Sequence, residues 1–232
     1  MKIALVGYGK MGREIEKTAL ERGHEIVSII DVDNPEDFDS PAFLSSTEVA
    51  IEFTCPESAY ANYQKCFERH IPVVAGTTGW LERKGLDEIK KACCEQGQTF
   101  FYAPNYSLGV NLFFALNRHL AKMMNRFPEY GVRVEDIHHI HKLDAPSGTA
   151  ITLAEDIVEN IDRENHNTLS IESEREGETA GIHQVVYDSD IDNISIRHEA
   201  KSRKGFALGA VIAAEFICGK TGFFTMDDLL KL

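Results

Sequence analysis

Short apolar runs alternate with amphipathic segments through the first hundred residues of the chain. Continuous apolar runs predict buried strands, and they lie at 2–7, 25–31, 49–54, 71–76 and 99–105. Apolar positions at helical spacing predict helices between these strands, at 10–22, 57–69 and 81–96. Strands that alternate with helices in this way predict an α/β fold with a doubly wound parallel sheet of the Rossmann type.

The pattern changes after residue 105. A long helix is predicted at 108–127 and a shorter one at 148–161, on either side of a predicted strand at 131–141. Three further strands are predicted without helices between them, followed by a final helix at 207–219; these strands lie at 168–174, 182–188 and 193–199. Clustered strands predict a mixed or antiparallel sheet, so we expect a second domain of α+β type.

Composition narrows the kinds of partner that the protein can have. The chain has 232 residues, 43% of them hydrophobic, which is enough to bury a core in one large domain or two modest ones. Its formal net charge of −13 argues against a nucleic-acid surface or an anionic membrane as partner. A small anionic substrate stays open, because a local basic pocket can override a diffuse negative field.

The sequence indicates neither disulfides nor a targeting segment. The five cysteines, an odd number that includes the adjacent Cys93 and Cys94, form no disulfide framework and no Cys-x-x-Cys metal motif. The segment "MKIALVGYGKMG" has no charged leader, and no apolar run approaches the ~18 residues of a membrane span. These features predict a cytoplasmic protein with reduced thiols.

A glycine-rich turn follows the first predicted strand. In "VGYGKMG", Gly7, Gly9 and Gly12 form the G-x-G-x-x-G pattern at the start of a helix. The first glycine permits a tight turn, the second lets a pyrophosphate approach the backbone, and the third lets helix and strand pack closely. Such glycines also occur for structural reasons alone. Here Asp31 ends the second predicted strand about 20 residues later, where a carboxylate meets the adenosine ribose, so we predict dinucleotide binding.

The surroundings of Asp31 predict which dinucleotide binds. A carboxylate accepts hydrogen bonds from a free 2′-hydroxyl and repels a 2′-phosphate. The adjoining stretch "DVDNPED" adds Asp33, Glu36 and Asp37 but no Arg or Lys. NADH is therefore predicted over NADPH, which stays the alternative cofactor.

The stretch "HHIHKLDAPSGTA" at 138–150 concentrates titratable side chains. If it continues the strand, His138 and Lys142 share one face, and His139 and His141 point to the other. Two histidines could supply two metal ligands, but no Cys and no third His has suitable spacing, so no metal is predicted. Solvated histidines at a strand end are the structural alternative. The functional interpretation is an anion-binding pocket whose imidazoles and ammonium supply protons.

The residues that follow favour the functional interpretation. "APSGTA" leads into the helix predicted at 148–161, with Ser147 or Thr149 as its N-cap. A helix N-terminus presents free N–H groups and a partial positive charge, which suit a carboxylate. Ser and Thr are ordinary caps, but this one comes a few residues after a lysine–histidine cluster.

Six segments together resemble a known family. "GYGKMGREI", "EFTCPE", "VAGTTGW", "APNYSLGVN", "HHIHKLDAPSGTA" and "GFFTMDDLL" are similar, in this order, to landmarks of the 4-hydroxy-tetrahydrodipicolinate reductase (dihydrodipicolinate reductase) family, from end to end of the chain. The resemblance implies an NAD(P)H-dependent oxidoreductase of the diaminopimelate route to lysine, and a homotetramer. It also implies a dinucleotide-binding domain of residues 1–107 and 204–232, and a substrate-binding and oligomerisation domain of residues 108–203.

The same resemblance implies roles for individual residues. Hydride passes from the reduced nicotinamide to a conjugated imine of a cyclic dicarboxylate, and His138 and Lys142 resemble the pair that donates the proton. His139 resembles a substrate contact, and the residues that resemble the carboxylate site are Ser147, Gly148 and Thr149. The residues that resemble cofactor contacts are Gly7, Tyr8, Gly9, Lys10, Met11, Gly12, Asp31, Gly76, Thr77, Thr78, Ala103, Pro104, Asn105, Tyr106, Arg203 and Phe206.

The sequence also differs from the family and leaves two other functions open. The segments "DVDNPEDFDSPAFLSS" and "REGETAGIHQVVYDSDIDNISIRH" are shorter than in the usual member, in regions that shape the adenosine pocket and the subunit interface. Another Rossmann oxidoreductase, such as an amino-acid or homoserine dehydrogenase, would explain the first half but leaves "HKLDAPSGT" without a reason. A non-catalytic NAD sensor would explain the glycines but needs neither His138 nor Lys142.

Overall fold

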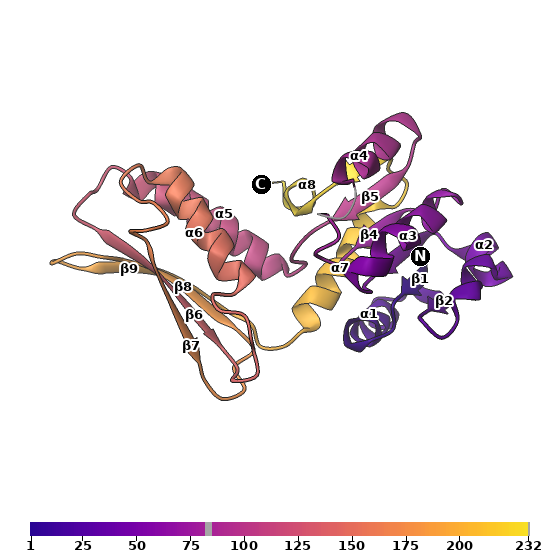
Figure 1. Cartoon of the computed structure of the whole chain (residues 1–232), viewed down its shortest axis with the longest axis horizontal. Coiled ribbons are helices and arrows are strands. Elements are labelled where there is room, and N and C mark those ends of the chain that lie inside the picture. Colours follow the sequence, from indigo (N-terminus) through magenta and orange to yellow (C-terminus); the bar gives the residue numbers. More distant parts are fainter. Residues whose placement is uncertain (82–84, 232) are drawn as a thin grey trace. The chain divides into compact units, whose positions relative to one another are not determined.

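The computed structural model describes residues 1–81 and 85–231. The chain folds as two compact units (Figure 1), Met1–Ser107 with Lys204–Leu232, and Leu108–Arg203. These are the ranges expected from the sequence, and each unit has a buried core of its own. None of the helices described is long and apolar enough to cross a membrane.

The first unit is built on a six-stranded sheet in the order β10-β5-β4-β3-β1-β2. Every neighbouring pair in it is parallel. The strands are β1 (Lys2–Val6), β2 (Glu25–Ile30), β3 (Val49–Glu52), β4 (Val73–Ala75), β5 (Thr99–Tyr102) and β10 (Gly222–Phe224). The prediction of a doubly wound parallel sheet is confirmed, and β10 is an addition that the sequence pattern did not predict. Strand order reverses at β1, the position where such sheets bind ligands beyond their carboxyl ends.

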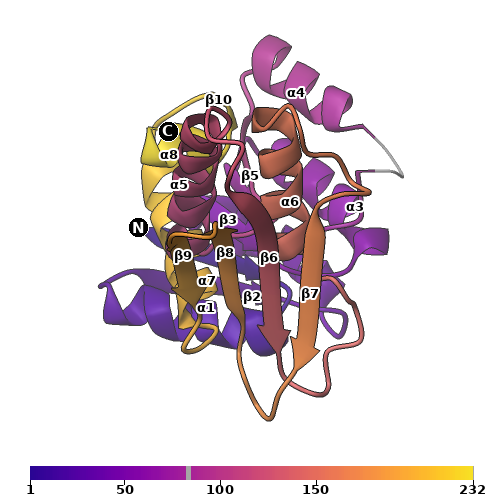
Figure 2. The same ribbon diagram turned by 90° about the vertical axis from the view of Figure 1, so that its left-hand side faces the viewer.

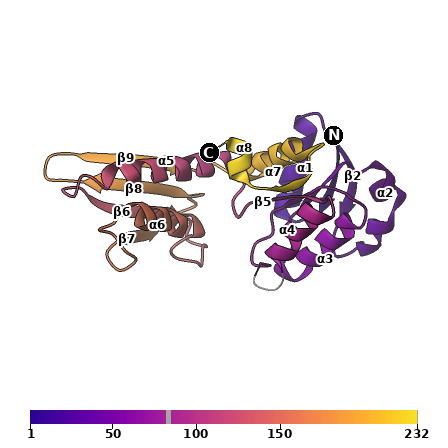
Figure 3. The ribbon, with the colours of Figure 1, turned by 90° about the horizontal axis from the view of Figure 1, so that it is seen from above.

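Helices cover both faces of this sheet (Figure 3). On one face α1 (Lys10–Glu21) packs against α7 (Lys204–Ile217), and on the other lie α3 (Pro56–Phe67) and α4 (Leu86–Glu95). Three short elements were not predicted because they span too few residues for a periodic pattern; they are η1 (Pro35–Asp39), α2 (Pro41–Ser46) and α8 (Met226–Leu230). The helix predicted at 81–96 is α4, and residues 82–84 of that range lie outside the described residues.

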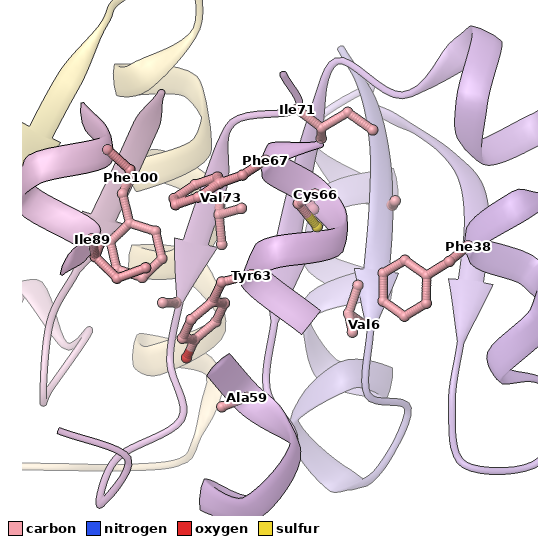
Figure 4. Close-up of a cluster of buried hydrophobic side chains, with 14 of the residues drawn as sticks. Val6, Phe38, Ala59, Tyr63, Cys66, Phe67, Ile71, Val73, Ile89 and Phe100 are labelled. Atoms are coloured by element: carbon pink, nitrogen blue, oxygen red, sulfur yellow. The ribbon is translucent and has the colours of Figure 1, made fainter. Parts of the chain in front are cut away.

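Aromatic side chains hold α3 against the sheet (Figure 4). The ring of Tyr63 meets those of Phe100 and Trp80 edge to face, with centroids 5.0 and 5.2 Å apart. Each such pair contributes about 0.5–1.5 kcal/mol beyond the burial of its area. All three side chains are fully buried. This packing holds α3 against β5 and against the segment that follows β4.

The second unit has a mixed four-stranded sheet in the order β7-β6-β8-β9. β6 pairs parallel to β7 and antiparallel to β8, which pairs antiparallel to β9. The strands are β6 (Gly131–His138), β7 (Ser170–Arg175), β8 (Ile182–Asp188) and β9 (Asn193–Glu199). Two helices, α5 (Leu108–Met124) and α6 (Gly148–Asn160), cover one face of this sheet (Figure 2). The predicted mixed sheet is confirmed, but β6 ends at His138, three residues earlier than predicted.

A buried acid on α6 makes the stability of the fold depend on pH. The Asp156 side chain is 11% exposed, and its Oδ2 lies 3.7 Å from Nη1 of Arg118. Burial raises the pKa of Asp156 from 3.8 to about 6, although Arg118 opposes this shift. The folded chain therefore holds an extra proton between these two pH values, and its free energy of unfolding falls as the pH rises through that window.

Asp156→Asn is expected to remove this pH dependence. The free energy of unfolding at pH 7 should rise by about 1–2 kcal/mol, a value discounted for the neighbouring Arg118 and for solvent screening. Urea denaturation at several pH values between about 4 and 7 measures the slope for both proteins. Glu155→Gln, at an exposed neighbour on the same helix, serves as the control and should keep the wild-type slope. Equal slopes for wild type and Asp156→Asn would contradict the assignment.

Candidate active site

Two glycines of the turn after β1, Gly7 and Gly12, have no room for side chains. Gly7 has φ +93°, and a Cβ there would lie 2.1 Å from the Phe53 carbonyl oxygen. A Cβ on Gly12 would lie 2.3 Å from the carbonyl oxygen of Gly7. Gly9 is the N-cap of α1 and offers no side-chain cap to the helix. The free N–H groups at the start of α1 can therefore meet a pyrophosphate, as the sequence predicts.

A cavity of about 380 Å³ opens beside this turn, and Asp31 is among its lining residues. The Asp31 carboxylate accepts hydrogen bonds from the backbone N–H of Tyr8 at 3.3 Å and of Val32 at 2.9 Å. These bonds hold the carboxylate against the turn and use only part of its acceptor capacity. The remaining lone pairs are free to accept ribose hydroxyls. Gly7, Tyr8 and Gly9 line the same cavity.

Other residues of this cavity were not identified from the sequence. They include Phe38 and Lys65, and the Lys65 ammonium lies 4.4 Å from the centroid of the Phe38 ring. No basic group was predicted near Asp31, because Lys65 lies on α3, far from Asp31 along the chain. Most of the others belong to the segment that contains "EFTCPE" and to α3 after it; they are Phe53, Thr54, Cys55, Ser58 and Asn62.

A second cavity, of about 520 Å³, lies on the other side of the turn. Its lining brings together six of the predicted cofactor residues, namely Gly9, Lys10, Met11, Gly76, Thr77 and Thr78. A Cβ on Gly76 would lie 2.1 Å from the ring of Phe53, which lines both cavities, so a side chain there would displace this ring. Two cavities that share the turn suit the two ends of one extended dinucleotide.

A buried carboxylate at the end of β3 fixes the wall of the second cavity. Glu52 accepts hydrogen bonds from the Thr77 hydroxyl and the Tyr63 hydroxyl, both at 3.0 Å, and from the Thr54 hydroxyl. The Thr77 hydroxyl also accepts the backbone N–H of Thr54 at 2.8 Å. Burial raises the pKa of Glu52, and the hydrogen bonds from Thr54, Thr77 and Tyr63 oppose that shift. Glu52 thus ties β3 to the turn after β4.

The remaining predicted cofactor residues do not line either cavity. The Tyr106 hydroxyl is buried and donates to the carbonyl oxygens of Ala75 and Phe101, at 2.8 and 3.3 Å, which supports β4 and β5. Gly12 allows α1 to approach the turn. Cofactor contacts stay predictions for the rest, which are Ala103, Pro104, Asn105, Arg203 and Phe206.

The second unit gathers its chemistry around Asp136, whose side chain is fully buried. Strand pairing places Asp136 directly opposite His183 on β8 and Ser173 on β7. Its Oδ1 lies 3.0 Å from Nε2 of His138 and 3.2 Å from Nε2 of His183. Its Oδ2 accepts the Ser173 hydroxyl at 3.2 Å and lies 3.8 Å from Nη1 of Arg175.

Asp136 also holds the start of α6. It accepts the backbone N–H of Ser147 at 3.0 Å and the Ser147 hydroxyl at 2.7 Å. Ser147 is the N-cap of α6, and its hydroxyl accepts the Ala150 N–H at 3.2 Å, so the predicted cap is confirmed. Gly148 is exposed and Thr149 half-buried at the same helix end. The structure therefore joins His138 to the predicted carboxylate site through one buried carboxylate.

Charges around this group set its protonation. Burial by itself raises the pKa of Asp136, but hydrogen bonds from His183 and Ser147 outweigh burial and hold the pKa below its ordinary range. Burial lowers the pKa of His138, and the charge of Asp136 offsets this in part. A buried carboxylate that stays ionised supplies the counter-charge for a protonated imidazole beside it.

The turn after His138 corrects one prediction. Because β6 ends at His138, the strand alternation that placed Lys142 on the same face, and His139 with His141 on the other, does not apply. Lys142 lies in a turn, where its ammonium pairs with the carboxylate of Asp144 at 2.7 Å and its carbonyl oxygen accepts Nε–H of Arg175 at 3.3 Å. The Lys142 side chain keeps 21% of its surface exposed.

A metal site is the other arrangement that these groups could form. Among the described residues, ligand atoms of Asp136, His138 and His183 lie within 4.8 Å of one another and are buried. The histidines predicted as the weak metal pair, His139 and His141, are not members; His141 contacts Glu178 at 3.2 Å. The Asp136 oxygens already lie at direct hydrogen-bonding distance from both rings. We therefore interpret the group as a hydrogen-bonded network.

Comparison with known proteins covers the whole chain. Residues 1–106 match the family model for the N-terminus of dihydrodipicolinate reductase, and residues 109–230 match the model for its C-terminus. The chain belongs to the dihydrodipicolinate reductase family. Membership agrees with the resemblance found in the sequence and accounts for the order of its six landmark segments.

Individual members of the reductase family are similar over their full length. A 4-hydroxy-tetrahydrodipicolinate reductase of Christiangramia forsetii is 48% identical, covering 100% of this chain and 98% of that protein. One from Neisseria gonorrhoeae is 32% identical with the same coverage. Among solved structures, dipicolinate-bound dihydrodipicolinate reductase from Paenisporosarcina sp. TG-14 has a TM-score of 0.76 at 20% identity, covering 97% of each chain, which shows the shared fold.

Three residues of the second unit were missed by sequence reasoning. Asp136, His183 and Arg175 lie on three different strands and meet because of strand register. His183 and Arg175 lack a local motif that could have marked them. Asp136 stands two residues before His138, which places it on the same strand face, and this period-two spacing was the available indication.

Proposed function

We propose that this chain reduces 4-hydroxy-tetrahydrodipicolinate to tetrahydrodipicolinate in the diaminopimelate route to lysine. The substrate, NAD(P)H and a proton give the reduced product, NAD(P)⁺ and water. The observation that carries the proposal is the network that joins His138 through Asp136 to Ser147 at the start of α6. It supports the proposal because one buried carboxylate contacts both the candidate proton donor and the cap of the candidate carboxylate-binding helix end. The full-length similarity to named reductases agrees with it.

The residues of each unit then have distinct tasks. The glycine turn and Asp31 hold the dinucleotide, whose reduced nicotinamide supplies the hydride, and Thr77 and Thr78 shape the second cavity. Loss of water from the hydroxylated substrate gives a conjugated imine. Addition of hydride to this imine leaves an enamine, which must gain a proton on carbon. His138 and Lys142 donate that proton and offset the charge of the dicarboxylate.

The substrate's carboxylates require cations and N–H groups. One carboxylate binds at the start of α6, where Gly148 and Thr149 present backbone N–H groups at the positive end of the helix dipole. Ser147, whose own N–H and hydroxyl bind Asp136, caps the helix at this site. His139 and Lys142 contact the substrate beside it. No metal is needed in this scheme, since the negative charge is met by protonated side chains and the helix end.

A coupled assay tests the proposed function. The upstream aldol synthase supplies the unstable substrate, and the oxidation of NADH is followed by absorbance. We expect NADH consumption that depends on the synthase and is inhibited by pyridine-2,6-dicarboxylate. Cofactor binding without turnover would favour the NAD-sensor alternative. Turnover with amino acids or homoserine, but not with the synthase product, would favour a different Rossmann oxidoreductase.

We propose NADH as the preferred cofactor, with NADPH as the alternative. Asp31 faces the cavity with its carboxylate and would repel a 2′-phosphate. Lys65, the basic residue among those that line this cavity, has its ammonium over the Phe38 ring, where the ring face attracts it. We therefore expect the Asp31 carboxylate to decide the preference for NADH over NADPH.

Asp31→Ser is expected to lower the ratio of kcat/KM for NADH to that for NADPH at least about tenfold, because the change removes the repulsion of a 2′-phosphate. Asp33→Ser, at an exposed carboxylate of the same loop, is the matched control and should leave the ratio unchanged. A strong preference of the wild-type protein for NADPH would refute the role given to Asp31.

We also propose that the protein is a homo-oligomer, with the tetramer expected from the family resemblance, and that copies meet on the sheet of the second unit. Its helices cover one face only (Figure 2). On the other face Ile137 and Ile182 stand opposite each other between rows of charged residues. Light scattering should give four times the chain mass of 26.0 kDa. A monomer mass at micromolar concentration would contradict the proposal.

A further inference from the structure

Asp136 is surrounded by groups that must donate to it. An ionised carboxylate only accepts hydrogen bonds, and this one has no exposed surface. The Ser147 backbone N–H and hydroxyl and the Ser173 hydroxyl point at its oxygens, at 3.0, 2.7 and 3.2 Å. The two imidazoles that reach Oδ1, from His138 and His183, are at donor distance as well. Each ring must therefore carry a hydrogen on Nε2.

This arrangement fixes the tautomer of His138. If Nε2–H is bound to Asp136, the neutral ring has its lone pair on Nδ1, and the protonated ring carries its second hydrogen there. Only the Nδ1 hydrogen can leave without breaking the contact with the buried carboxylate. The atom of His138 that exchanges a proton is then Nδ1.

Gly181 leaves that edge of the ring uncovered. It has φ +152°, and a Cβ built on it would lie 2.9 Å from Cε1 and 3.3 Å from Nδ1 of His138. Any other residue at this position would press on the edge that carries Nδ1. On one side of His138, therefore, Gly181 has no side chain to press on the ring. On the other side lies the His183 ring of β8, whose centroid is 5.1 Å from that of His138.

We propose that Asp136 is a positioning residue that holds the Nε2 hydrogen of His138, so that Nδ1 delivers the proton to the substrate. The inference deepens the proposed function and rests on it. The same carboxylate binds Ser147, the N-cap of α6. Asp136 therefore holds both the proton donor and the helix end of the carboxylate site in place. In the reaction the Nδ1–H bond breaks, a C–H bond forms at the enamine carbon, and His138 becomes neutral while Asp136 stays ionised.

His183 completes the support. Its Nε2 lies 3.1 Å from the Ser147 hydroxyl and 3.3 Å from Nε2 of His138. Its Nδ1 is buried and has no hydrogen-bond partner. A lone pair there is less costly than an unpaired N–H, which agrees with a hydrogen on Nε2. His183 thus donates toward Ser147 and Asp136 and holds the hydroxyl that caps α6.

The first test is Asp136→Asn, which keeps the shape but presents an N–H or a neutral oxygen to the rings. We expect kcat to fall about 10- to 100-fold at neutral pH, because the amide no longer selects the Nε2–H tautomer. Glu135→Gln is the control. Glu135 is the neighbouring carboxylate on the opposite face of β6, where Arg133 contacts it at 3.1 Å, and its change should leave kcat near the wild-type value.

The pH profile separates positioning from a loss of structure. The charged or titratable groups around His138 are Asp136 on its own strand, His183 on β8, Arg175 on β7 and Lys142 in the turn. Asp136 is the one that favours the charged imidazole. Without its charge, the fall of kcat with rising pH should begin about one pH unit lower. In a variant that is only less stable, kcat should fall with rising pH at the same pH as in the wild-type protein.

Two further measurements add to this test, and the first does not depend on how well Asp136→Asn folds. Nitrogen-15 NMR of the wild-type protein should show His138 with its hydrogen on Nε2 when neutral. In the His138→Ala background, Asp136→Asn should change kcat less than threefold, since its effect acts through His138. A neutral His138 with its hydrogen on Nδ1, or a full additional loss of kcat in the double variant, would overturn the proposal.

The outcomes also distinguish this inference from the proposed function. Absence of synthase-dependent turnover in the wild-type protein sinks the proposed function. Normal wild-type turnover with an unchanged kcat and pH profile in Asp136→Asn sinks the inference alone. Loss of activity on treatment with EDTA, restored by zinc, would likewise overturn it, because Asp136 would then be a metal ligand.

Discussion

Lys142→Ala and His138→Ala are each expected to lower kcat by at least about tenfold, because each change slows the donation of the proton to the substrate. A placed proton donor contributes typically ~100- to 10,000-fold to a rate, and two donors that share the task leave part of it to the remaining one. In the proposed function Lys142 also offsets the charge of the dicarboxylate, so Lys142→Ala should raise KM as well. The coupled assay at saturating NADH measures both constants.

The two roles of Lys142 can be separated. Lys142→Arg keeps the positive charge but gives up a readily lost proton, because a guanidinium stays protonated. We expect KM to recover toward the wild-type value in this variant while kcat stays low. Two controls should keep wild-type kcat. Leu143→Ala changes the exposed neighbour of Lys142, and His119→Ala changes an exposed histidine on α5. Wild-type kcat in both alanine variants of the pair would refute their roles.

Gly7→Ala is expected to weaken NADH binding at least about 100-fold, which corresponds to about 2.7 kcal/mol. The backbone there has φ +93°, and the new Cβ would meet the Phe53 carbonyl oxygen at 2.1 Å. Phe53 lines both cavities, so relief of this clash must distort the cofactor site. Calorimetric titration with NADH measures the change, and circular dichroism shows whether the fold persists.

Gly23→Ala provides the matched control for Gly7→Ala. Gly23 also has a positive φ, +80°, but nothing lies within 4 Å of the position that its Cβ would take. The cost there is backbone strain alone, about 1–2 kcal/mol of stability, with no effect on NADH affinity. Equal affinities for NADH in wild type and Gly7→Ala would show that this turn does not hold the cofactor.

Much of the fold followed from local pattern. Strands β1 to β5, helices α1, α3 and α4 and the mixed sheet were predicted because apolar periodicity is a property of neighbouring residues. β10 was not predicted, because three residues are too few to show an apolar periodicity. Its partner β5 also lies far away along the chain. η1 and α2 were not predicted either, because they are also too short to show a periodic pattern.

The end of β6 shows where local pattern fails. The sequence predicts one strand through His141, yet the strand stops at His138. The cause lies outside the segment: Ile140 N–H bonds to the carbonyl oxygen of Gly177, and the Arg175 guanidinium binds carbonyl oxygens of the turn. These partners come from β7 and the loop after it, which no pattern within 138–142 can disclose.

The sequence by itself determined the cofactor turn and the cap of α6, because a glycine that must avoid a clash and a serine that must meet a free N–H act within a few residues. It also marked His138 and Lys142 as chemically distinct. Only the tertiary structure decided what stands beside them. The pairing of β6 with β7 and β8 sets Asp136 against His183 and Ser173, and strand register depends on the packing of whole strands rather than on any one stretch of sequence.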